Sequence, residues 1–301
     1  MYDTIVIGAG VAGITAAIYA SRKRMKFELI SPDLGGHLAL TGDLLNYPGV
    51  VKTTGLDFMS ALEEQLNFNK VKPVMAAVRE VKKLASGFKV ITDKREYETK
   101  TVIIASGSKP RKLNIPGEDR FAKKGVAYCS ICDGPLFADM SVAIIGGGNS
   151  ALEAVEFMKD IASKIYLLVL ESKLSGHEYL QEKVRQNPKV EVIYNAKTKE
   201  IVGDEFVSGV KYEQAGRQKK IDVKGVIIEI GLVPNTEAFK SLVDLDEHGH
   251  IKIDCQGNTS VPGVFAAGDC ASGHEYQYVI AAGQGCMALL KAAKYLSKLK
   301  D

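Results

Sequence analysis

The first thirty residues alternate between short β-branched runs and a longer stretch of helical pattern. A β-branched run at 4–7 ends in GAGVAG at 8–13, an alanine-rich stretch continues to Arg24, and a second apolar run occupies 27–30. Short apolar runs bounded by turn residues are typical of buried strands, and the stretch between them is long enough for a helix. The pattern predicts a strand, a glycine turn, a helix and a second strand, which together form a βαβ unit.

The same order of elements returns about 140 residues later. A β-branched run at 142–145 leads into GGGNSA at 146–151, a helical pattern extends from 152 to about 159, and an apolar run fills 164–170. Two such units predict an α/β protein with two Rossmann-like, dinucleotide-binding domains of the three-layer, parallel-sheet type.

Glycine suits both turns for the same physical reasons. A tight turn from strand to helix needs a positive φ, and a pyrophosphate can approach the backbone closely where no Cβ intervenes. The helix N-terminus adds free N–H groups and a positive dipole. Because glycine also serves plain strand–helix packing, either turn alone is consistent with packing or with binding, and the two together favour nucleotide binding at the first.

Three later segments complete the pattern. A strand at 102–107 ends in glycine, and the prolines and glycines that follow it up to Gly117 indicate a crossover between domains. An apolar run at 263–269 ends in Gly-Asp, where Asp269 is either a turn residue or an acceptor for ribityl or ribose hydroxyls. A last helix is expected from about 279 to 299.

Composition narrows the function classes. The 301 residues carry 39 Lys and Arg against 36 Asp and Glu, a net charge of +3, and 46% of them are hydrophobic. These values fit a folded protein of about two domains and give no reason to expect nucleic acid as a partner. The longest uncharged run, residues 4–21, has the length of a membrane helix, but its three glycines and the lack of a positive leader argue against a span or a signal peptide. We expect a cytoplasmic protein with no membrane partner.

A local group of cations lies near the predicted crossover. Its members are Lys109, Arg111, Lys112, Lys123 and Lys124. Such a group is either a solvated face or a docking patch for an acidic protein, and the sequence leaves both interpretations open.

The cysteine count argues against a secreted disulfide framework. Five Cys is an odd and small number, whereas Cys129 and Cys132 form a CxxC pair, which in a reducing compartment is redox-active or metal-binding. Zinc needs two more soft ligands, but the other Cys show no second pair spacing and the five His no ligand spacing, so we expect no metal. Cys255, Cys270 and Cys286 are expected to be buried small apolar residues.

Eight motifs stand in the order that is found in one protein family. They are GAGVAG at 8–13, LGGHL at 34–38, NYPG at 46–49, IIASGSKPR at 103–111, CSICDG at 129–134, GGGNSALE at 146–153, IGLVPNT at 230–236 and GVFAAGDC at 263–270. Over essentially its whole length the chain therefore resembles the low-molecular-weight thioredoxin reductases. The resemblance implies FAD as cofactor and a homodimer. It also implies a discontinuous FAD-binding domain, residues 1–112 and 244–301, into which a pyridine-nucleotide-like domain, residues 113–243, is inserted with the redox pair.

Residue chemistry and resemblance agree on the Cys pair. Two thiols three residues apart, at the start of a helix that follows 126–128, can form a reducible disulfide whose thiolate is stabilised by the helix end. The resemblance implies that Cys132 faces the flavin and receives its electrons, and that Cys129 attacks the disulfide of oxidised thioredoxin. It also implies that Asp133 protonates a departing thiolate.

The resemblance assigns the flavin contacts residue by residue. The candidate cofactor-binding residues are Gly8, Gly10, Gly13, Gly36, His37, Asn46, Gly107, Asp269, Gln277 and Tyr278. The glycines of the first turn would cradle the pyrophosphate, Asn46 would approach the isoalloxazine ring, and Asp269 would bind the ribityl and pyrophosphate region. The family commonly has Gln in place of His37, which could keep a hydrogen bond to the flavin. It has Arg-Gln in place of Gln277-Tyr278, so Tyr278 is either a residue that stacks on the ring or part of surface-helix packing.

The larger departure from the family concerns the electron donor. NADPH-using members hold the 2′-phosphate with a His-Arg-Arg run after the second strand of the inserted domain and a further Arg downstream. Here Val169, Leu170 and Glu171 stand in that run, and Ser175 stands at the downstream position. Related NADH-using flavoproteins carry their acid where this chain has Val169. The pattern is similar to the ferredoxin-dependent flavin thioredoxin reductases, which implies reduced ferredoxin as donor and thioredoxin as acceptor.

Three other interpretations stay open. The second glycine turn is consistent with an NADPH- or NADH-dependent reductase, although it also serves strand–helix packing. A non-catalytic, FAD-bound redox sensor would need neither both thiols nor Asp133, so the complete CSICDG motif argues against it. An acceptor such as a glutaredoxin-like protein would keep the chemistry and change only the partner.

Overall fold

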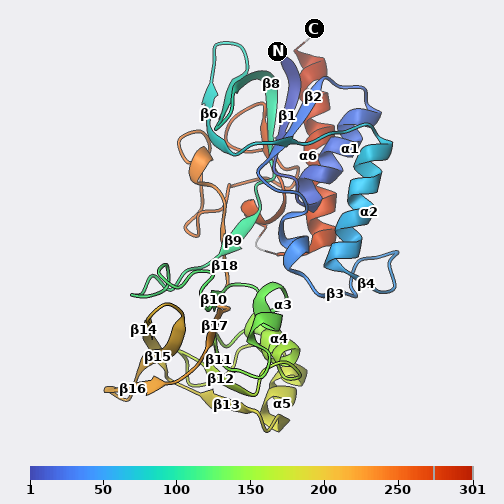
Figure 1. Ribbon diagram of the computed structural model, residues 1–301. Helices are drawn as coiled ribbons and strands as arrows, with labels where there is room; N and C mark the ends of the chain where they lie inside the picture. The colour runs from blue at the N-terminus through green and yellow to red at the C-terminus, as the bar shows by residue number, and fades with distance from the viewer. Residues whose placement is uncertain (274, 300–301) are drawn as a thin grey trace. The chain divides into compact units, whose positions relative to one another are not determined.

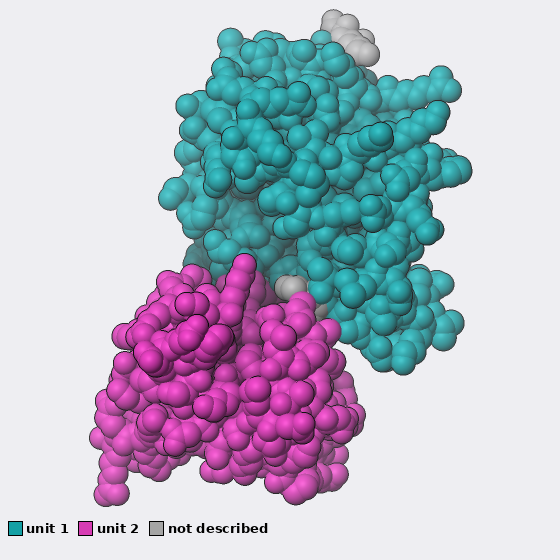
Figure 2. All heavy atoms as spheres, viewed as in Figure 1, with its two compact units in different colours: residues 1–109, 233–301 teal, residues 110–232 magenta. Residues whose placement is uncertain are grey.

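The chain divides into two compact units in the computed structural model, which describes residues 1–273 and 275–299. Unit 1 comprises residues 1–109 and the chain from 233 onward, and unit 2 comprises residues 110–232 (Figure 2). The second boundary lies earlier than the 243/244 that the sequence suggested. Residues after 233 pack with unit 1, because the Asn235 N–H donates to the Gly107 carbonyl at 2.9 Å and Phe239 is buried in the core of that unit.

Unit 1 is built on a seven-stranded sheet in the order β5-β2-β1-β8-β7-β6, with β19 also paired to β8. The strands β1, β2, β5, β8 and β19 pair in parallel, and β6 and β7 extend the sheet in antiparallel fashion. Their bounds are β1 Tyr2–Ile7, β2 Phe27–Ser31, β5 Val74–Met75, β6 Val78–Lys83, β7 Phe88–Thr92, β8 Glu96–Ile104 and β19 Val264–Ala266.

Three helices cover one face of this sheet, as Figure 1 shows. They are α1 (Val11–Arg22), α2 (Gly55–Phe68) and α6 (Tyr278–Lys298). The helices α1 and α6 approach each other closely, since a Cβ on Gly285 would lie 2.1 Å from the Ala12 carbonyl oxygen. On the opposite face a second apolar cluster includes residues such as Phe239, Val243 and Ile251.

Short elements complete unit 1 and its boundaries. They are η1 Gly36–Leu40, β3 Asp43–Leu44, β4 Thr53–Thr54, β9 Ser108–Pro110, β18 Leu232–Pro234, η3 Glu237–Phe239 and η4 Gly268–Cys270. The strands β9 and β18 pair with each other, and both boundaries between the units fall within them.

Unit 2 contains a five-stranded parallel sheet in the order β10-β17-β11-β12-β13. One apolar cluster joins this sheet to α4 and α5, and another joins it to a three-stranded antiparallel sheet, β14-β15-β16. The bounds are β10 Val126–Ala127, α3 Ser130–Asp133, η2 Gly134–Phe137, β11 Ser141–Ile145, α4 Asn149–Met158, β12 Lys164–Leu168, α5 Glu178–Gln186, β13 Val190–Ile193, β14 Lys197–Gly203, β15 Val207–Gln214, β16 Arg217–Ile221 and β17 Gly225–Ile228.

The predicted α/β class with two parallel-sheet units is confirmed. Both glycine turns connect a strand to a helix, and each helix has a glycine as its N-cap, Gly10 for α1 and Gly148 for α4. The long uncharged run at 4–21 is most of a strand, the turn and most of α1. Within the described part of the chain, no helix has the length and apolar character that crossing a membrane requires.

Candidate active site

The first glycine turn is closed on one side and open on the other. Gly8 has φ +103°, and a Cβ there would lie 2.1 Å from the Ala105 carbonyl oxygen. A Cβ on Gly13 would lie 1.8 Å from the Gly8 carbonyl oxygen, whereas a Cβ on Gly10 would meet no atom within 4 Å. Gly10 also precedes α1 without a side-chain cap, so the helix N–H groups face an open space that suits a pyrophosphate.

Two more of the predicted glycines adjoin this turn. Gly36 has φ +54°, and its Cβ position is 3.5 Å from the Gly10 Cα. Gly107 has φ +64°, follows the segment that packs on Gly8, and has no atom within 4 Å of its Cβ position. The structure therefore brings backbone without side chains together from three segments, which fits a dinucleotide that lies close to the main chain.

His37 and Asp269 are joined through Ser108. The His37 Nε2 lies 2.9 Å from the Ser108 carbonyl oxygen, and the Ser108 hydroxyl donates to the Asp269 carboxylate at 3.1 Å. A carbonyl oxygen only accepts, so the His37 Nε2 carries a proton in this arrangement. Sequence reasoning missed Ser108, although it lies within the IIASGSKPR motif.

Asn235 fixes the loop that carries Ser108. Its side-chain amide donates to the Ser106 carbonyl at 3.2 Å and to the Ser108 carbonyl at 3.1 Å. In return the Ser106 hydroxyl donates to the Asn235 carbonyl at 2.6 Å. Asn235 belongs to the IGLVPNT motif, which is the signal that could have identified it as part of this site.

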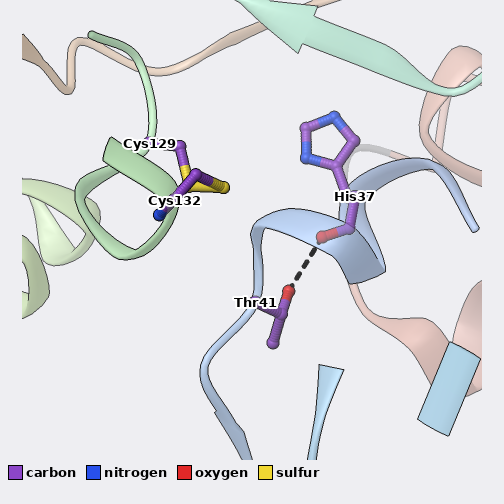
Figure 3. Close-up of a disulfide and its surroundings, with 4 residues drawn as sticks. All are labelled: His37, Thr41, Cys129 and Cys132. Atoms are coloured by element: carbon purple, nitrogen blue, oxygen red, sulfur yellow. Dashed lines mark hydrogen bonds between the residues drawn. A yellow bond between two sulfur atoms is a disulfide. The ribbon is translucent and has the colours of Figure 1, made fainter. Parts of the chain in front are cut away.

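The segment before α6 contacts the segment after η1. The Asn46 amide donates to the Gln277 side-chain oxygen at 3.2 Å, and both residues are exposed. The Tyr278 hydroxyl contacts the Thr41 hydroxyl, which also hydrogen-bonds the His37 carbonyl at 3.0 Å (Figure 3). Burial raises the pKa of the Tyr278 phenol. No sequence motif singled out Thr41.

The Cys129–Cys132 pair forms a disulfide in unit 2 (Figure 3). Cys129 follows β10 and is the N-cap of α3, and its Sγ accepts a hydrogen bond from the Cys132 N–H at 3.0 Å. The two Cα atoms are 5.4 Å apart, Cys129 is 8% exposed and Cys132 is exposed. The expected helix start is confirmed, and the Asp133 N–H donates to the Cys129 carbonyl at 3.1 Å.

The other cysteines differ from one another. Cys270 is buried, which raises the pKa of its thiol, and Cys286 is half-buried. The prediction of a buried Cys255 was wrong, because this residue lies exposed in a turn closed by the Gly257 N–H on the Asp254 carbonyl. Across residues 1–273 and 275–299, no group of three or more His, Cys, Asp or Glu is arranged to hold a metal ion.

The second glycine turn is closely covered by its own loop. Gly146 has φ +142°, and the Gly147 carbonyl accepts hydrogen bonds from the Ser175 N–H at 2.8 Å and the Gly176 N–H at 3.2 Å. After β12, Val169 is fully buried and Glu171 is exposed. Thus the first position of the run 169–171 points into the core, and the third points to solvent.

A half-buried carboxylate adjoins this second turn. A Cβ on Gly146 would lie 2.1 Å from the carbonyl oxygen of Glu229, the residue directly after β17. Burial raises the pKa of the Glu229 carboxyl to about 7, the negative charge of Glu153 adds to the rise, and a hydrogen bond with Ser150 opposes it. Sequence reasoning missed Glu229, which directly precedes the IGLVPNT motif.

Comparison with known proteins defines the class. Residues 2–285 match the profile of the pyridine nucleotide-disulphide oxidoreductase family. The chain is 39% identical over 300 residues to a subunit of the alkyl hydroperoxide reductase of Staphylococcus aureus (strain MSSA476), a match that covers 98% of this chain and 59% of that protein. The chain thus spans about three-fifths of the length of this relative.

Two solved structures are similar over nearly the whole chain. Thioredoxin reductase from Lactococcus lactis superposes with a TM-score of 0.93 and 32% identity, covering 99% of this chain and 100% of that one. A ferredoxin-flavin thioredoxin reductase from Clostridium acetobutylicum superposes with a TM-score of 0.56 and 31% identity, covering 99% and 98%.

Fold, glycine turns and disulfide together define a flavoprotein disulfide oxidoreductase that uses FAD. The chain belongs to the pyridine nucleotide-disulphide oxidoreductase family, and its structural neighbours include low-molecular-weight thioredoxin reductases.

Proposed function

We propose that this protein is a thioredoxin reductase in which Cys129 and Cys132 pass electrons to the disulfide of thioredoxin. The observation that carries the proposal is the disulfide at the start of α3, with its first sulfur at the helix N-terminus. The similarity to the Lactococcus lactis thioredoxin reductase over the full length of both chains supports this choice of acceptor. On the resemblance, we also propose a homodimer.

Unit 1 is the proposed FAD domain. The open face of the first glycine turn would take the pyrophosphate, and Asp269 and His37, linked through Ser108, would contact the cofactor beside it. Asn46, Gln277 and Tyr278 would bound the ring. Bound FAD can accept electrons singly or in pairs and supply two of them to a disulfide.

The residues of the reduced pair then act in order. The Cys129 thiolate attacks one sulfur of the thioredoxin disulfide, so that a mixed disulfide forms and the other thioredoxin sulfur departs with the electron pair. Asp133 is the proposed donor of the proton that the departing thiolate takes up. The Cys132 thiolate next attacks the Cys129 sulfur, which releases dithiol thioredoxin and restores the Cys129–Cys132 disulfide.

Reduced ferredoxin is the proposed electron donor. A nucleotide 2′-phosphate needs fixed cations, and the segment 164–177 contains no Arg. The carboxyls of Glu229 and Glu153 lie near each other at the second glycine turn, and negative charge there would repel a pyrophosphate. The similarity to a ferredoxin-flavin thioredoxin reductase also supports this donor.

A nicotinamide nucleotide is the second candidate donor. The second glycine turn is present with the required strand and helix, and the family to which the chain belongs is described by pyridine nucleotides. NADH fits better than NADPH because Glu171 and Val169 stand where a 2′-phosphate would need cations.

Anaerobic titration of the purified flavoprotein distinguishes the donors. Absorbance of the oxidised flavin is followed during parallel additions of NADPH, NADH and photoreduced ferredoxin. The proposal predicts complete bleaching by ferredoxin and slow or no bleaching by either nucleotide. Bleaching by NADH or NADPH within the turnover time would overturn the ferredoxin proposal and leave the thioredoxin proposal to be tested separately.

A further inference from the structure

A buried carboxylate in unit 2 is tied to the residue before the redox pair. Glu118 is only 2% exposed, and its two oxygens accept four hydrogen bonds. The donors are the N–H groups of Leu113 at 3.0 Å, Asn114 at 2.6 Å and Ile115 at 3.4 Å, and the hydroxyl of Tyr128 at 2.6 Å. A buried carboxylate with so many donors is held rigidly, because losing any partner would leave charge unsatisfied.

Tyr128 is the residue through which this carboxylate reaches the Cys pair. It stands between β10, which is fixed by pairing with β17, and Cys129, the N-cap of α3. Its ring packs on the apolar cluster that also contacts Leu113 and Ile115. Ring packing and the hydroxyl bond to Glu118 therefore fix the backbone directly before the Cys129 sulfur.

We propose that Glu118 is a positioning residue for the redox pair, which it holds by anchoring Tyr128. The inference rests on the proposed redox role of Cys129 and Cys132. Disulfide closure within one chain depends on how well both sulfurs are prearranged, since prearrangement raises the effective concentration of one thiol at the other. Loosening the backbone before Cys129 lowers that concentration and favours the dithiol.

The test is the equilibrium between disulfide and dithiol in the FAD-loaded protein. Wild type, Tyr128→Phe and Glu118→Gln are equilibrated without oxygen in buffers of reduced and oxidised dithiothreitol. Thiols are then alkylated, and the peptide with Cys129 and Cys132 is quantified by mass spectrometry. Reducing the pair breaks its S–S bond with two electrons and two protons from dithiothreitol, which closes to its own cyclic disulfide.

The expected result is a shift toward the dithiol of about 3- to 10-fold in Tyr128→Phe, the size of effect that loss of one coupled interaction produces. Glu118→Gln should shift the ratio in the same direction, and the double variant should add little to the larger single effect because both act through one contact. Tyr166→Phe is the matched control, since Tyr166 packs on the same cluster from β12. Its ratio should equal that of wild type.

A folded Tyr128→Phe protein with the wild-type ratio would overturn the proposal, even if its melting temperature fell, because that outcome describes a structural role only. An equal shift in Tyr166→Phe would also overturn it. The measurement does not use thioredoxin. A shifted ratio in an enzyme that fails to reduce thioredoxin would therefore keep this inference and reject the proposed acceptor.

Discussion

Replacing Glu229 with Gln should stabilise the protein at alkaline pH and not at acidic pH. The fold raises the pKa of this carboxyl from its ordinary value of 4.5 to about 7, chiefly through burial. Between these two values the folded protein keeps a proton that the unfolded chain has lost, so stability falls as pH rises through the window and the loss is complete above pH 7. Gln carries no proton to lose and keeps a similar shape.

The size of the effect follows from the pKa difference. At about 1.4 kcal/mol for each pH unit, a rise from 4.5 to about 7 corresponds to roughly 3 kcal/mol. Because Glu229 is only half-buried, solvent screening reduces the expected gain of Glu229→Gln at pH 8 to about 1–3 kcal/mol. Below pH 4.5 both proteins carry a neutral side chain there, and their stabilities should agree within about 0.5 kcal/mol.

Urea unfolding at pH 5 and pH 8, with FAD in excess, measures this difference. Glu182→Gln serves as control, because Glu182 is an exposed acid on α5 of the same unit. Its effect should be the same at both pH values. A Glu229→Gln protein whose gain does not grow between pH 5 and pH 8 would refute the argument that this carboxyl is held neutral by the fold.

Three further predictions concern the cofactor and the Cys pair. Gly8→Ala should cost about 2–4 kcal/mol and release FAD on gel filtration, because the new Cβ would lie 2.1 Å from the Ala105 carbonyl oxygen at φ +103°; a variant that keeps its flavin would contradict the cradle. Ser108→Ala should weaken FAD binding by about tenfold, the loss expected for a charge-assisted hydrogen bond, as measured by flavin fluorescence; unchanged binding would remove Ser108 from the site. Cys132→Ser should accumulate a mixed disulfide between Cys129 and thioredoxin on non-reducing gels, and wild-type turnover by this variant would reject the dithiol mechanism.

Local sequence patterns predicted the elements around both glycine turns because each element follows from nearby residues. The helix expected at 152–159 begins at Asn149, directly after Gly148, so the glycine turn itself set the true start. The redox pair was predictable for the same reason, since its spacing and the helix after β10 are local features.

Contacts between distant segments were not predictable from the sequence alone. The Ser108 link between His37 and Asp269 joins three segments far apart in the chain, and Thr41 meets Tyr278 across a similar separation. The second unit boundary was placed too late for the same reason, because only tertiary packing shows that the chain after 233 returns to unit 1.

The central claim is that Cys129 and Cys132 deliver electrons to thioredoxin, and a single-turnover transfer tests it most directly. The FAD-loaded enzyme is reduced without oxygen, freed of excess reductant, and mixed with one equivalent of oxidised thioredoxin. The account predicts that thioredoxin gains two thiols as the enzyme pair returns to the disulfide, and that Cys129→Ser abolishes this transfer. Full transfer by Cys129→Ser, or none by the reduced wild type, would contradict it.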